Sequence, residues 1–420
     1  MKTDLSSANR VSMRARLART FVRIDLALLP DHPTKPVIAP LLHRLDPQFR
    51  DCWLLMDRDT SAHDNAEHLY RHLREHHSEI NAWFVLSPAS PDWQRLEQEG
   101  FRLLPYGTAR HARALMQCCE LISSQIDHYV ISPPVVVWLR RRPWRFTWLQ
   151  HGVIQSDLSG WLNGKPVRTV VTTTPAEHRS VTRLPYVWTD REVVLTGLAR
   201  HDALLRKASE VPRRERRLVV VMPTWRDDLL EGLGSGNERV ARKGFWESQY
   251  VMNWLGLLRS PAVREAAISQ NLELVFMPHP NIEPHIRAEH LPAYVRVASY
   301  NTDDVQSVLA HASHVVTDYS SNAFEAALLD RPVLYYQFDA EHFHSGVHIG
   351  RPGYFDYERD GFGPVVKTPN EAERALVSLL EAGKAPSEPY GTRIRRTFVF
   401  RDGQACRRIV HAVLDHAREP

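Results

Sequence analysis

Residues 315–336 read VVTDYSSNAFEAALLDRPVLYY, and this stretch is the strongest indicator of the fold. Val315 and Val316 end an apolar run that is typical of a buried strand, and residues 333–336 form a second such run. Between the two runs, Ser320 and Ser321 are favourable residues for the start of a helix. The stretch therefore predicts a β-turn-α-β unit, with two hydroxyls and the free amides of a helix start at the carboxyl end of a strand.

A helix start in this position is suited to binding phosphate. The unpaired amides and the helix dipole both favour an anion, and ligands of open α/β sheets bind at the carboxyl ends of the strands. The alternative is an ordinary capped helix in a parallel-sheet protein, and this segment alone does not separate the two interpretations.

The rest of the chain repeats the alternation of apolar runs and helical patterns, which predicts parallel sheets covered by helices. The expected strands are residues 52–56, 82–86, 102–104, 120–124, 146–150, 169–174 and 193–197, followed by 218–222, 272–277, 295–299, 314–316 and 333–336. A chain of 420 residues is too long for one compact core. Because the pattern restarts after residue 195, we predict two α/β halves. Residues 65–77 are expected to form a helix that Asp64 caps. Residues 229–244, rich in glycine and charge, are expected to form a mobile loop.

The amino-acid composition limits the classes of function that this protein can have. The 43% apolar fraction is ordinary for a globular protein, and no run is long enough for a membrane span or a signal peptide. The four cysteines have neither disulfide-framework nor zinc spacing, which favours a cytoplasmic location. A net charge of only +4, without a basic stripe interleaved with aromatic residues, argues against a nucleic-acid partner.

Two histidines at predicted strand ends are candidates for catalysis. His151 follows the apolar strand 146–150, and Gly152 permits a sharp turn, so His151 can accept a proton from an attacking hydroxyl. His279 ends the strand 272–277 and can donate to phosphate oxygens. The alternative for each is a structural histidine, of which a chain with 22 histidines must hold many.

A third group of polar residues, Thr224 and Arg226, follows the predicted strand 218–222. Arg226 can grip a phosphate through its guanidinium. The alternative is a surface salt bridge between Arg226 and Asp227 or Asp228.

Six segments then occur in an order that resembles one family. They are LQHGVIQSD (149–157), LTGLARHDALL (195–205), VVVMPTWRDD (219–228), VFMPHP (275–280), TDYSSNAFEAALLDRPVLYYQFD (317–339) and GYFDYERDGFGPVV (353–366). The chain resembles the CDP-glycerol glycerophosphotransferases, the polymerases and primases of teichoic-acid and capsule synthesis, from about Trp53 to the final helix.

The resemblance implies a GT-B-like α/β fold, with two Rossmann-like domains facing a cleft. The residue pattern near the start of the chain adds an N-terminal helical segment. The expected parts are a helical, membrane-contacting segment (1–40), an acceptor domain (41–195), a CDP-donor domain (196–400) and a C-terminal helix that crosses back (401–420).

The resemblance also assigns roles to the candidate residues. His151 would be the general base, and His279 would be the second catalytic histidine. The donor CDP-glycerol would be held by Thr224, Arg226, Asp318, Ser320, Ser321 and Glu325. Ser320 and Ser321 would hold the pyrophosphate, Asp318 would orient a histidine or those hydroxyls, and Glu325 would accept from the ribose. The family usually has Asp where this chain has Glu325, and a solvated helix face is the alternative there.

The expected reaction transfers glycerol phosphate to a hydroxyl of a lipid-linked polyol-phosphate or glycan acceptor and releases CMP, without a cofactor. The open alternatives are a GT-B glycosyltransferase that uses a nucleotide sugar, a CDP-ribitol enzyme, and a non-catalytic polymer-binding subunit. Arg200 and Asp202 are expected to form an ion pair at a domain hinge.

Two patterns mimic metal sites. Asp57 and Asp59 form a DxD pattern that we expect on a surface loop, and Glu341, His342, His344 and His348 form a cluster without a helical metal-binding frame. We therefore expect no metal.

Within residues 1–30, Met13, Leu17, Phe21, Ile24 and Leu28 fall on one helical stripe, with Arg14, Arg16, Arg19 and Arg23 beside it. Such a helix can rest on an anionic membrane, which would make the protein peripheral on the inner face of the cell membrane. Packing of the helix on the first domain is the alternative.

Overall fold

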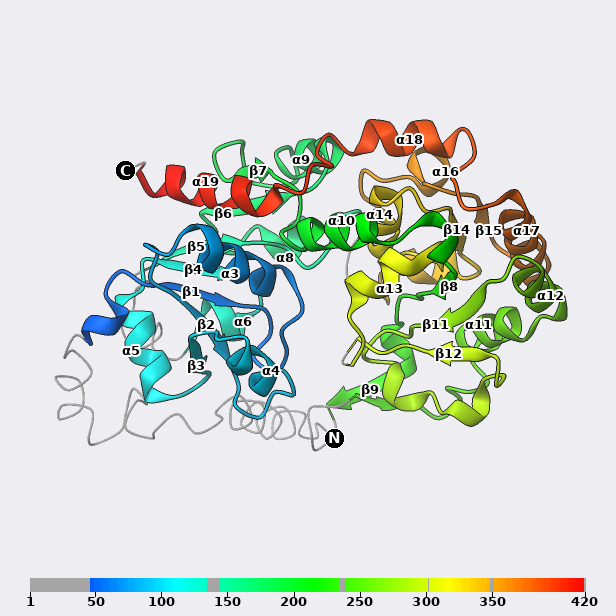
Figure 1. Ribbon diagram of the computed structural model, residues 1–420, viewed down its shortest axis with the longest axis horizontal. Coiled ribbons are helices and arrows are strands. Elements are labelled where there is room, and N and C mark those ends of the chain that lie inside the picture. Colours follow the sequence, from blue (N-terminus) through cyan, green and yellow to red (C-terminus); the bar gives the residue numbers. More distant parts are fainter. Residues whose placement is uncertain (1–45, 134–143, 234–238, 301, 348–350, 419–420) are drawn as a thin grey trace, which may run out of the picture. The chain divides into compact units, whose positions relative to one another are not determined.

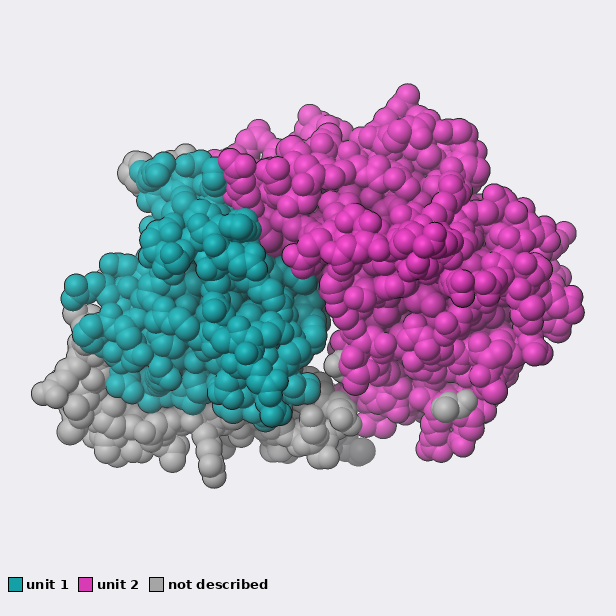
Figure 2. All heavy atoms as spheres, viewed as in Figure 1, with its two compact units in different colours: residues 1–151, 165–171, 409–420 teal, residues 152–164, 172–408 magenta. Residues whose placement is uncertain are grey.

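The computed structural model describes residues 46–133, 144–233, 239–300, 302–347 and 351–418. The chain forms two compact units, coloured separately in Figure 2. The first unit comprises residues 1–151, 165–171 and 409–420, and the second comprises residues 152–164 and 172–408. The boundaries predicted at residues 40, 195 and 400 stay predictions, because units of dense contact need not coincide with domains. The predicted N-terminal helix lies outside the described residues.

The first unit is built on a parallel sheet with the strand order β3-β2-β1-β4-β5-β6 (Figure 1). Its strands are β1 (Trp53–Met56), β2 (Ala82–Leu86), β3 (Leu103–Pro105), β4 (Glu120–Ser123), β5 (Arg145–Trp148) and β6 (Thr169–Thr172), whose last residue belongs to the second unit. Its helical segments are η2 (Pro47–Phe49), α3 (Asn65–His76), α4 (Trp93–Gln98), α5 (Ala109–Gln117) and α6 (His128–Ile131). β1 and β4 are adjacent although β2 and β3 intervene in the chain, so the strand order reverses between them.

The second unit has a parallel sheet with the order β12-β11-β8-β13-β14-β15. Its strands are β8 (Leu218–Val221), β11 (Glu273–Phe276), β12 (Val295–Val297), β13 (Ala312–Thr317), β14 (Val333–Tyr336) and β15 (Val365–Val366). Here the order reverses between β8 and β13. Ligands of open α/β sheets bind at such reversals, outside the carboxyl ends of the strands.

Helices cover both faces of the second sheet (Figure 1). One apolar core packs α10 (Arg200–Glu210), α13 (Val305–His311) and α14 (Asn322–Leu328) on the sheet, and the other packs α11 (Gln249–Arg259), α12 (Pro261–Ser269) and α17 (Pro369–Ala382). Val219 and Val221 of β8 belong to one core and Val220 to the other, because successive side chains of a strand point to opposite faces.

The remaining elements of the second unit are short. They are α8 (Ser159–Leu162), α9 (Pro175–Val181), β7 (Val193–Leu195), η3 (Arg213–Glu215), η4 (Asp227–Leu229), β9 (Leu230–Leu233), β10 (Arg239–Ala241), η5 (Glu283–His285), η6 (Ala288–His290), α15 (Ala340–His342), the π-helix η7 (Phe343–Val347), α16 (Tyr357–Asp360) and α18 (Tyr390–Thr397). β9 and β10 pair antiparallel, so the mobile loop predicted over 229–244 is wrong in its described part.

The final helix, α19 (Ala405–Arg418), ends in the first unit. There Nδ1 of His416 lies 2.7 Å from the hydroxyl of Thr169 at the start of β6, and Arg168 donates to the His416 carbonyl at 3.0 Å. These bonds fix the end of α19 on the first sheet.

Candidate functional site

In the first unit, His151 contacts the carboxylate of Asp64. The side chain of His151 is 61% exposed, whereas that of Asp64 is 11% exposed. Asp64 precedes α3, and its Oδ2 accepts from Nδ1 of His151, which follows β5. When Nδ1 carries the proton, the basic lone pair of the neutral ring lies on Nε2. Asp64 therefore orients His151 and selects the tautomer that a general base needs.

Asn65 holds both members of this pair. Its backbone amide and Nδ2 donate to Oδ1 of Asp64 at 2.8 and 3.0 Å. The same Nδ2 donates to the carbonyl of Gln150 at 2.9 Å. Gln150, next to His151 in the chain, has a φ of +62°, in the left-handed region that non-glycine residues rarely adopt. The structure thus maintains an unfavourable backbone conformation immediately before His151.

Asp57 binds the backbone at the start of α3. Its carboxylate accepts the amides of Asp64, Ala66 and Glu67 at 3.1, 2.8 and 3.2 Å, and the hydroxyl of Ser124 at 2.5 Å. Burial, followed by the charge of Asp64, raises the pKa of Asp57 to about 7. Asp57 is 1% exposed, so the expected surface loop is wrong at this residue. Its role is to receive the free amides of a helix start, at the strand reversal between β1 and β4.

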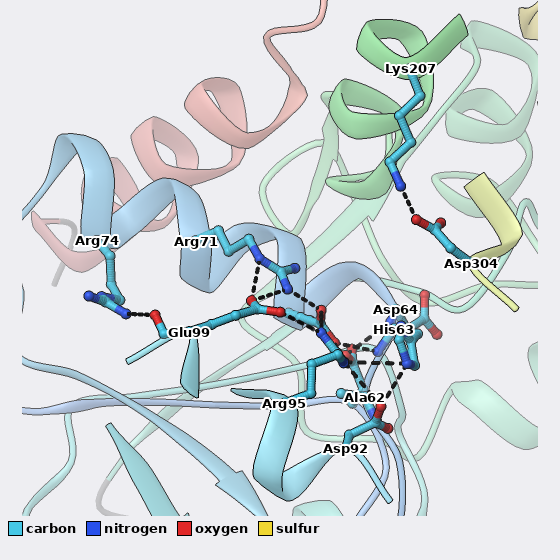
Figure 3. A network of polar contacts seen from close by, with 12 residues as sticks. Ala62, His63, Asp64, Arg71, Arg74, Asp92, Arg95, Glu99, Lys207 and Asp304 are labelled. Carbon is cyan, nitrogen blue, oxygen red and sulfur yellow. Dashed lines mark hydrogen bonds and ion pairs between the residues drawn. The ribbon is translucent and has the colours of Figure 1, made fainter. Parts of the chain in front are cut away.

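A network of ion pairs fixes the loop before α3 (Figure 3). Nη1 of Arg95 donates to buried Glu67 at 2.9 Å, and the amide of His63 donates to the same carboxylate at 2.7 Å. Nε2 of His63 lies 2.6 Å from Asp92. Burial alone raises the pKa of Glu67, but Arg95 and Arg71 hold it well below its usual range. Glu67 therefore stays ionised. Because it binds the amide of His63, the residue before Asp64, it also helps to keep Asp64 in place.

In the second unit, Asp318 organises the strand reversal. It is fully buried after β13, and its carboxylate accepts the amides of Thr224 and Tyr319 at 2.8 and 2.6 Å. Nη2 of Arg226 donates to its other oxygen at 2.8 Å. Thr224 and Arg226 follow β8, the neighbour of β13, so the two predicted groups do meet here. Among the described residues, the Asp318 carboxylate thus binds backbone amides and an arginine, not the histidine or the serine hydroxyls that we expected it to orient.

Arg226 is 3% exposed and lies between two carboxylates. Nε donates to Asp339 at 2.7 Å, Nη1 to the carbonyl of Thr224 at 2.7 Å, and Nη2 to Asp318. Burial alone lowers the pKa of Arg226, but Asp318 and Asp339 raise it above its ordinary value. The expected alternative of a surface pair with Asp227 or Asp228 is wrong. All three nitrogens already have acceptors, so Arg226 shapes the site and needs a rearrangement to grip a phosphate directly.

Ser320 and Ser321 begin α14 in different ways. The hydroxyl of Ser320 accepts the amide of Asn322 at 3.2 Å. Ser321 occupies the cap position without a side-chain cap bond, so the expected capping is wrong for this hydroxyl. A Cβ on Gly152 would lie 2.2 Å from Oγ of Ser321. An alanine after His151 would therefore displace the hydroxyl of Ser321, the residue before α14.

Glu325 lies on the buried face of α14. It is 3% exposed and accepts from Nε of Arg200 at 2.5 Å. The solvated face predicted as its alternative is wrong, and so is the Arg200–Asp202 pair, because Asp202 instead accepts the amides of Ala405 and Cys406, both at 2.8 Å. To accept a hydrogen bond from a ribose, Glu325 would have to keep or give up its ion pair with Arg200.

His279 follows β11 and stacks on Trp225, with 5.8 Å between ring centroids. Its Nδ1 accepts the amide of Asn281 at 3.2 Å, so the ring proton lies on Nε2 in the neutral form. Nε2 is thus a hydrogen-bond donor, as the expected contact with phosphate requires. The guanidinium of Arg239 lies 4.3 Å from the Trp225 ring. Trp225 was missed because its position within PTWR gives no sign of stacking.

The predicted metal-like patterns do not form a metal site in the described part of the chain. No group of three or more His, Cys, Asp or Glu side chains there is arranged to hold a metal ion. His342 instead lies 2.7 Å from Asp228. His348 lies outside the described residues.

Two carboxylates of the candidate site were not predicted from the sequence. Asp64 was identified only as a helix cap, and Asp339 only as the end of a motif. The signal for Asp64 was present, since it follows β1 and His151 follows β5. Predicting their contact would have required the strand order β1-β4-β5, which cannot be derived from the sequence alone.

Comparison with known proteins places these features in context. A family model described as CDP-glycerol:poly(glycerophosphate) glycerophosphotransferase matches residues 41–415. The minor teichoic acid biosynthesis protein GgaB of Bacillus subtilis is 28% identical over 91% of this chain and 42% of its own length. The teichoic acid glycerol-phosphate transferase of Staphylococcus aureus is 25% identical over 53% of this chain and 54% of its own. The chain thus spans about half, or less, of the length of these curated relatives.

A solved structure, that of the wall teichoic acid polymerase TagF, covers 98% of both chains with a TM-score of 0.63 at 14% identity. This similarity confirms the predicted GT-B-like α/β fold.

Proposed function

The chain belongs to the CDP-glycerol:poly(glycerophosphate) glycerophosphotransferase family, and on this premise we propose that it transfers glycerol phosphate from CDP-glycerol to an acceptor hydroxyl. The acceptor oxygen attacks the β-phosphorus of the donor and forms a new phosphodiester bond. The bond between the β-phosphorus and the oxygen that bridges to the α-phosphate breaks, and CMP leaves. The product is a polymer of teichoic-acid or capsule type, or its priming unit.

His151 is the general base in this proposal, and the contact with Asp64 carries it. Nε2 takes the proton of the acceptor hydroxyl while Asp64 stabilises the imidazolium that forms, which contributes about 10²–10⁴-fold to the rate. A site that only binds a polymer needs cations and no oriented base. The Asp64–His151 pair therefore favours an enzyme over a non-catalytic polymer-binding subunit.

The donor phosphates are assigned to the second unit. We assign Nε2 of His279, the hydroxyls of Ser320 and Ser321, and Thr224 to the phosphate oxygens. Asp318 and Arg226 support these groups, because they tie the loop after β8 to the loop after β13. Glu325 is assigned to the ribose side of the donor together with its partner Arg200. Since phosphoryl transfer depends mainly on positioning and charge stabilisation, these rigid loops supply most of the acceleration.

Two alternatives would use the same phosphate site. A ribitol-phosphate transferase would use the same phosphate site with a longer polyol. A GT-B glycosyltransferase would use it with a nucleotide sugar. The family match favours glycerol, and the donor assay below separates the three.

The acceptor is proposed to be lipid-linked, with the protein peripheral on the membrane. Among the described helices, none is both long and apolar enough to cross a bilayer. The basic amphipathic pattern of residues 1–30, which lies outside the described residues, supports contact with an anionic surface.

The test is to incubate the protein separately with CDP-glycerol, CDP-ribitol and UDP-sugars in the presence of a polyol-phosphate acceptor and to measure released CMP or UDP. We expect CMP from CDP-glycerol, and a rate lowered about 10²–10⁴-fold in His151→Ala. His76→Ala, at an exposed histidine of α3, is the matched control. Release of UDP alone, or full activity of His151→Ala, would overturn the proposal.

A further inference from the structure

A cavity of about 460 Å³ lies in the second unit, in a region that the proposed chemistry does not use. Arg179 of α9 and Arg183 line it together with Leu184, Tyr186, Asp157 and the segment 352–354. We name it the Arg179–Arg183 pocket. Its volume suits a small polar group with a few attached carbons, such as one unit of a polyol phosphate.

The side chains of the two arginines are exposed, and neither guanidinium group has a hydrogen bond or ion pair with a residue that the structure describes. They are four residues apart, at the end of α9 and just beyond it. Two positive side chains in one pocket repel each other, and a bound anion would relieve this repulsion. Asp157 supplies one negative charge to the wall, and its Oδ1 accepts the amide of Ser159 at 2.9 Å. The pocket therefore has a net positive charge. The planar guanidinium groups that carry it can each donate two hydrogen bonds to phosphate oxygens.

The wall of the pocket is held by backbone contacts. Asp157 and Arg351 exchange two amide-to-carbonyl bonds of 2.9 and 3.1 Å. A Cβ on Gly353 would lie 2.3 Å from the carbonyl of Gln155, so only glycine permits this approach. The hydroxyl of Tyr186 accepts the amide of Leu158 at 2.9 Å. The pocket is thus a formed feature of the unit and not a gap between loose side chains.

One short segment connects the pocket to the proposed donor side of the same unit. Residues 152–157 begin at Gly152, whose backbone lies against Ser321, and end at Asp157 in the pocket wall. Five residues span at most ~18 Å. Midway along the segment, Oε1 of Gln155 accepts from the hydroxyl of Tyr357 at 3.0 Å. A polyol-phosphate chain of a few units covers the distance from Ser321 to the pocket.

We propose that the Arg179–Arg183 pocket binds a phosphodiester within the acceptor chain, behind the unit that carries the attacking hydroxyl. This inference rests on the proposed function and makes it more specific. The preferred acceptor already contains polyol phosphate, and two guanidinium groups hold it at a distance from the reacting atoms. A neutral glycan acceptor would leave both arginines without a counter-charge.

The experiment compares the double variant Arg179→Gln/Arg183→Gln with a matched double variant, Arg206→Gln/Arg407→Gln, at exposed arginines of α10 and α19 in the same unit. The probe is a soluble glycerol phosphate oligomer of several units. Its binding is measured by calorimetry without donor, and its KM is measured with CDP-glycerol. We expect the pocket variant to bind the oligomer at least about tenfold more weakly and to raise its KM, since charge-assisted bonds to phosphate are lost. The KM for CDP-glycerol and the properties of the control should not change.

The outcomes separate this inference from the proposed function. If wild type binds the oligomer and the pocket variant binds it equally well, the pocket is not the phosphodiester site, whether or not CMP is released. If wild type does not bind the oligomer, the inference is also overturned. If wild type releases no CMP but oligomer binding depends on the two arginines, the transferase proposal fails while the phosphate site stands.

Sedimentation with phosphatidylglycerol vesicles tests whether the pocket contacts a membrane. Loss of vesicle binding with unchanged oligomer binding would make the pocket, with its 91% exposed Leu184, a membrane contact instead.

Discussion

Asp64 at the start of α3 contacts Nδ1 of His151 after β5, although 87 residues separate them in the chain. Parallel strands bring the two together, because β1, β4 and β5 are consecutive in the sheet and their carboxyl ends lie at one edge. The contact orients one exposed histidine among 22, the residue that we propose as the general base.

Replacing Asp64 by Asn should lower kcat by about 10²–10⁴-fold, because an uncharged partner neither selects the Nε2 base nor stabilises the imidazolium. The KM for CDP-glycerol should change little. Asp127→Asn is the matched control, since Asp127 precedes α6 without a side-chain cap bond. An unchanged kcat would show that Asp64 has only a structural role.

Replacing Ser320 and Ser321 together by Ala should weaken the binding of CDP-glycerol. Each lost hydrogen bond to a phosphate is worth on the order of 1–3 kcal/mol, and calorimetry measures the sum. Unchanged affinity would place the pyrophosphate elsewhere.

Gly152→Ala independently tests whether the hydroxyl of Ser321 binds the donor. The added Cβ would displace Oγ of Ser321, so donor affinity should fall without loss of the fold. The control is Gly160→Ala, whose Cβ would meet nothing within 4 Å. In the background of Ser321→Ala, the effect of Gly152→Ala should become smaller, because the oxygen that clashes is gone.

Arg226→Ala should lower the free energy of unfolding by about 3–5 kcal/mol. It leaves Asp318 and Asp339 buried without their shared cation, and removing one partner of a buried pair is costly. Urea denaturation checks the value. Arg206→Ala, on the exposed side of α10, should stay within about 0.5 kcal/mol of wild type. A similarly small effect at Arg226 would mean that the two carboxylates find other partners.

Acid should destabilise the protein in part through His314, which is fully buried in β13. Burial lowers its pKa from 6.5 to about 4. Between pH 6.5 and 4 the unfolded chain therefore binds a proton that the folded chain does not, so stability falls as pH falls through this window. At pH 5 the loss from this group is about 2 kcal/mol.

His314→Gln tests the pH prediction by comparison with wild type, because other groups, such as Asp57 with its raised pKa, are common to both proteins. The difference in unfolding free energy between pH 7.5 and 5 should be smaller in the variant, whereas exposed His76→Gln should behave as wild type. Equal pH dependence of all three proteins would assign the acid sensitivity to other groups.

Deleting residues 1–30 should abolish sedimentation with anionic vesicles and preserve transfer to a soluble acceptor. The reason is the basic amphipathic pattern of this segment, which lies outside the described residues. An unfolded truncated protein, or one that still binds vesicles, would show that the segment packs on the protein or that other residues contact the membrane.

The sequence by itself determined the alternation of strands and helices, the parallel sheets and the positions of the polar motifs at strand ends. These features follow from local periodicity and from residues such as Ser320 and Gly152, whose preferences act over a few neighbours. The tertiary structure alone decided which motifs meet. Arg226 was interpreted as a phosphate ligand or part of a surface pair, and Glu325 as a ribose ligand or a solvated residue. The reason is that their partners Asp339 and Arg200 lie more than a hundred residues away. Asp64 was read as a helix cap for the same reason. Strand order decides such long-range pairs, and strand order depends on the packing of whole units, which no local pattern encodes.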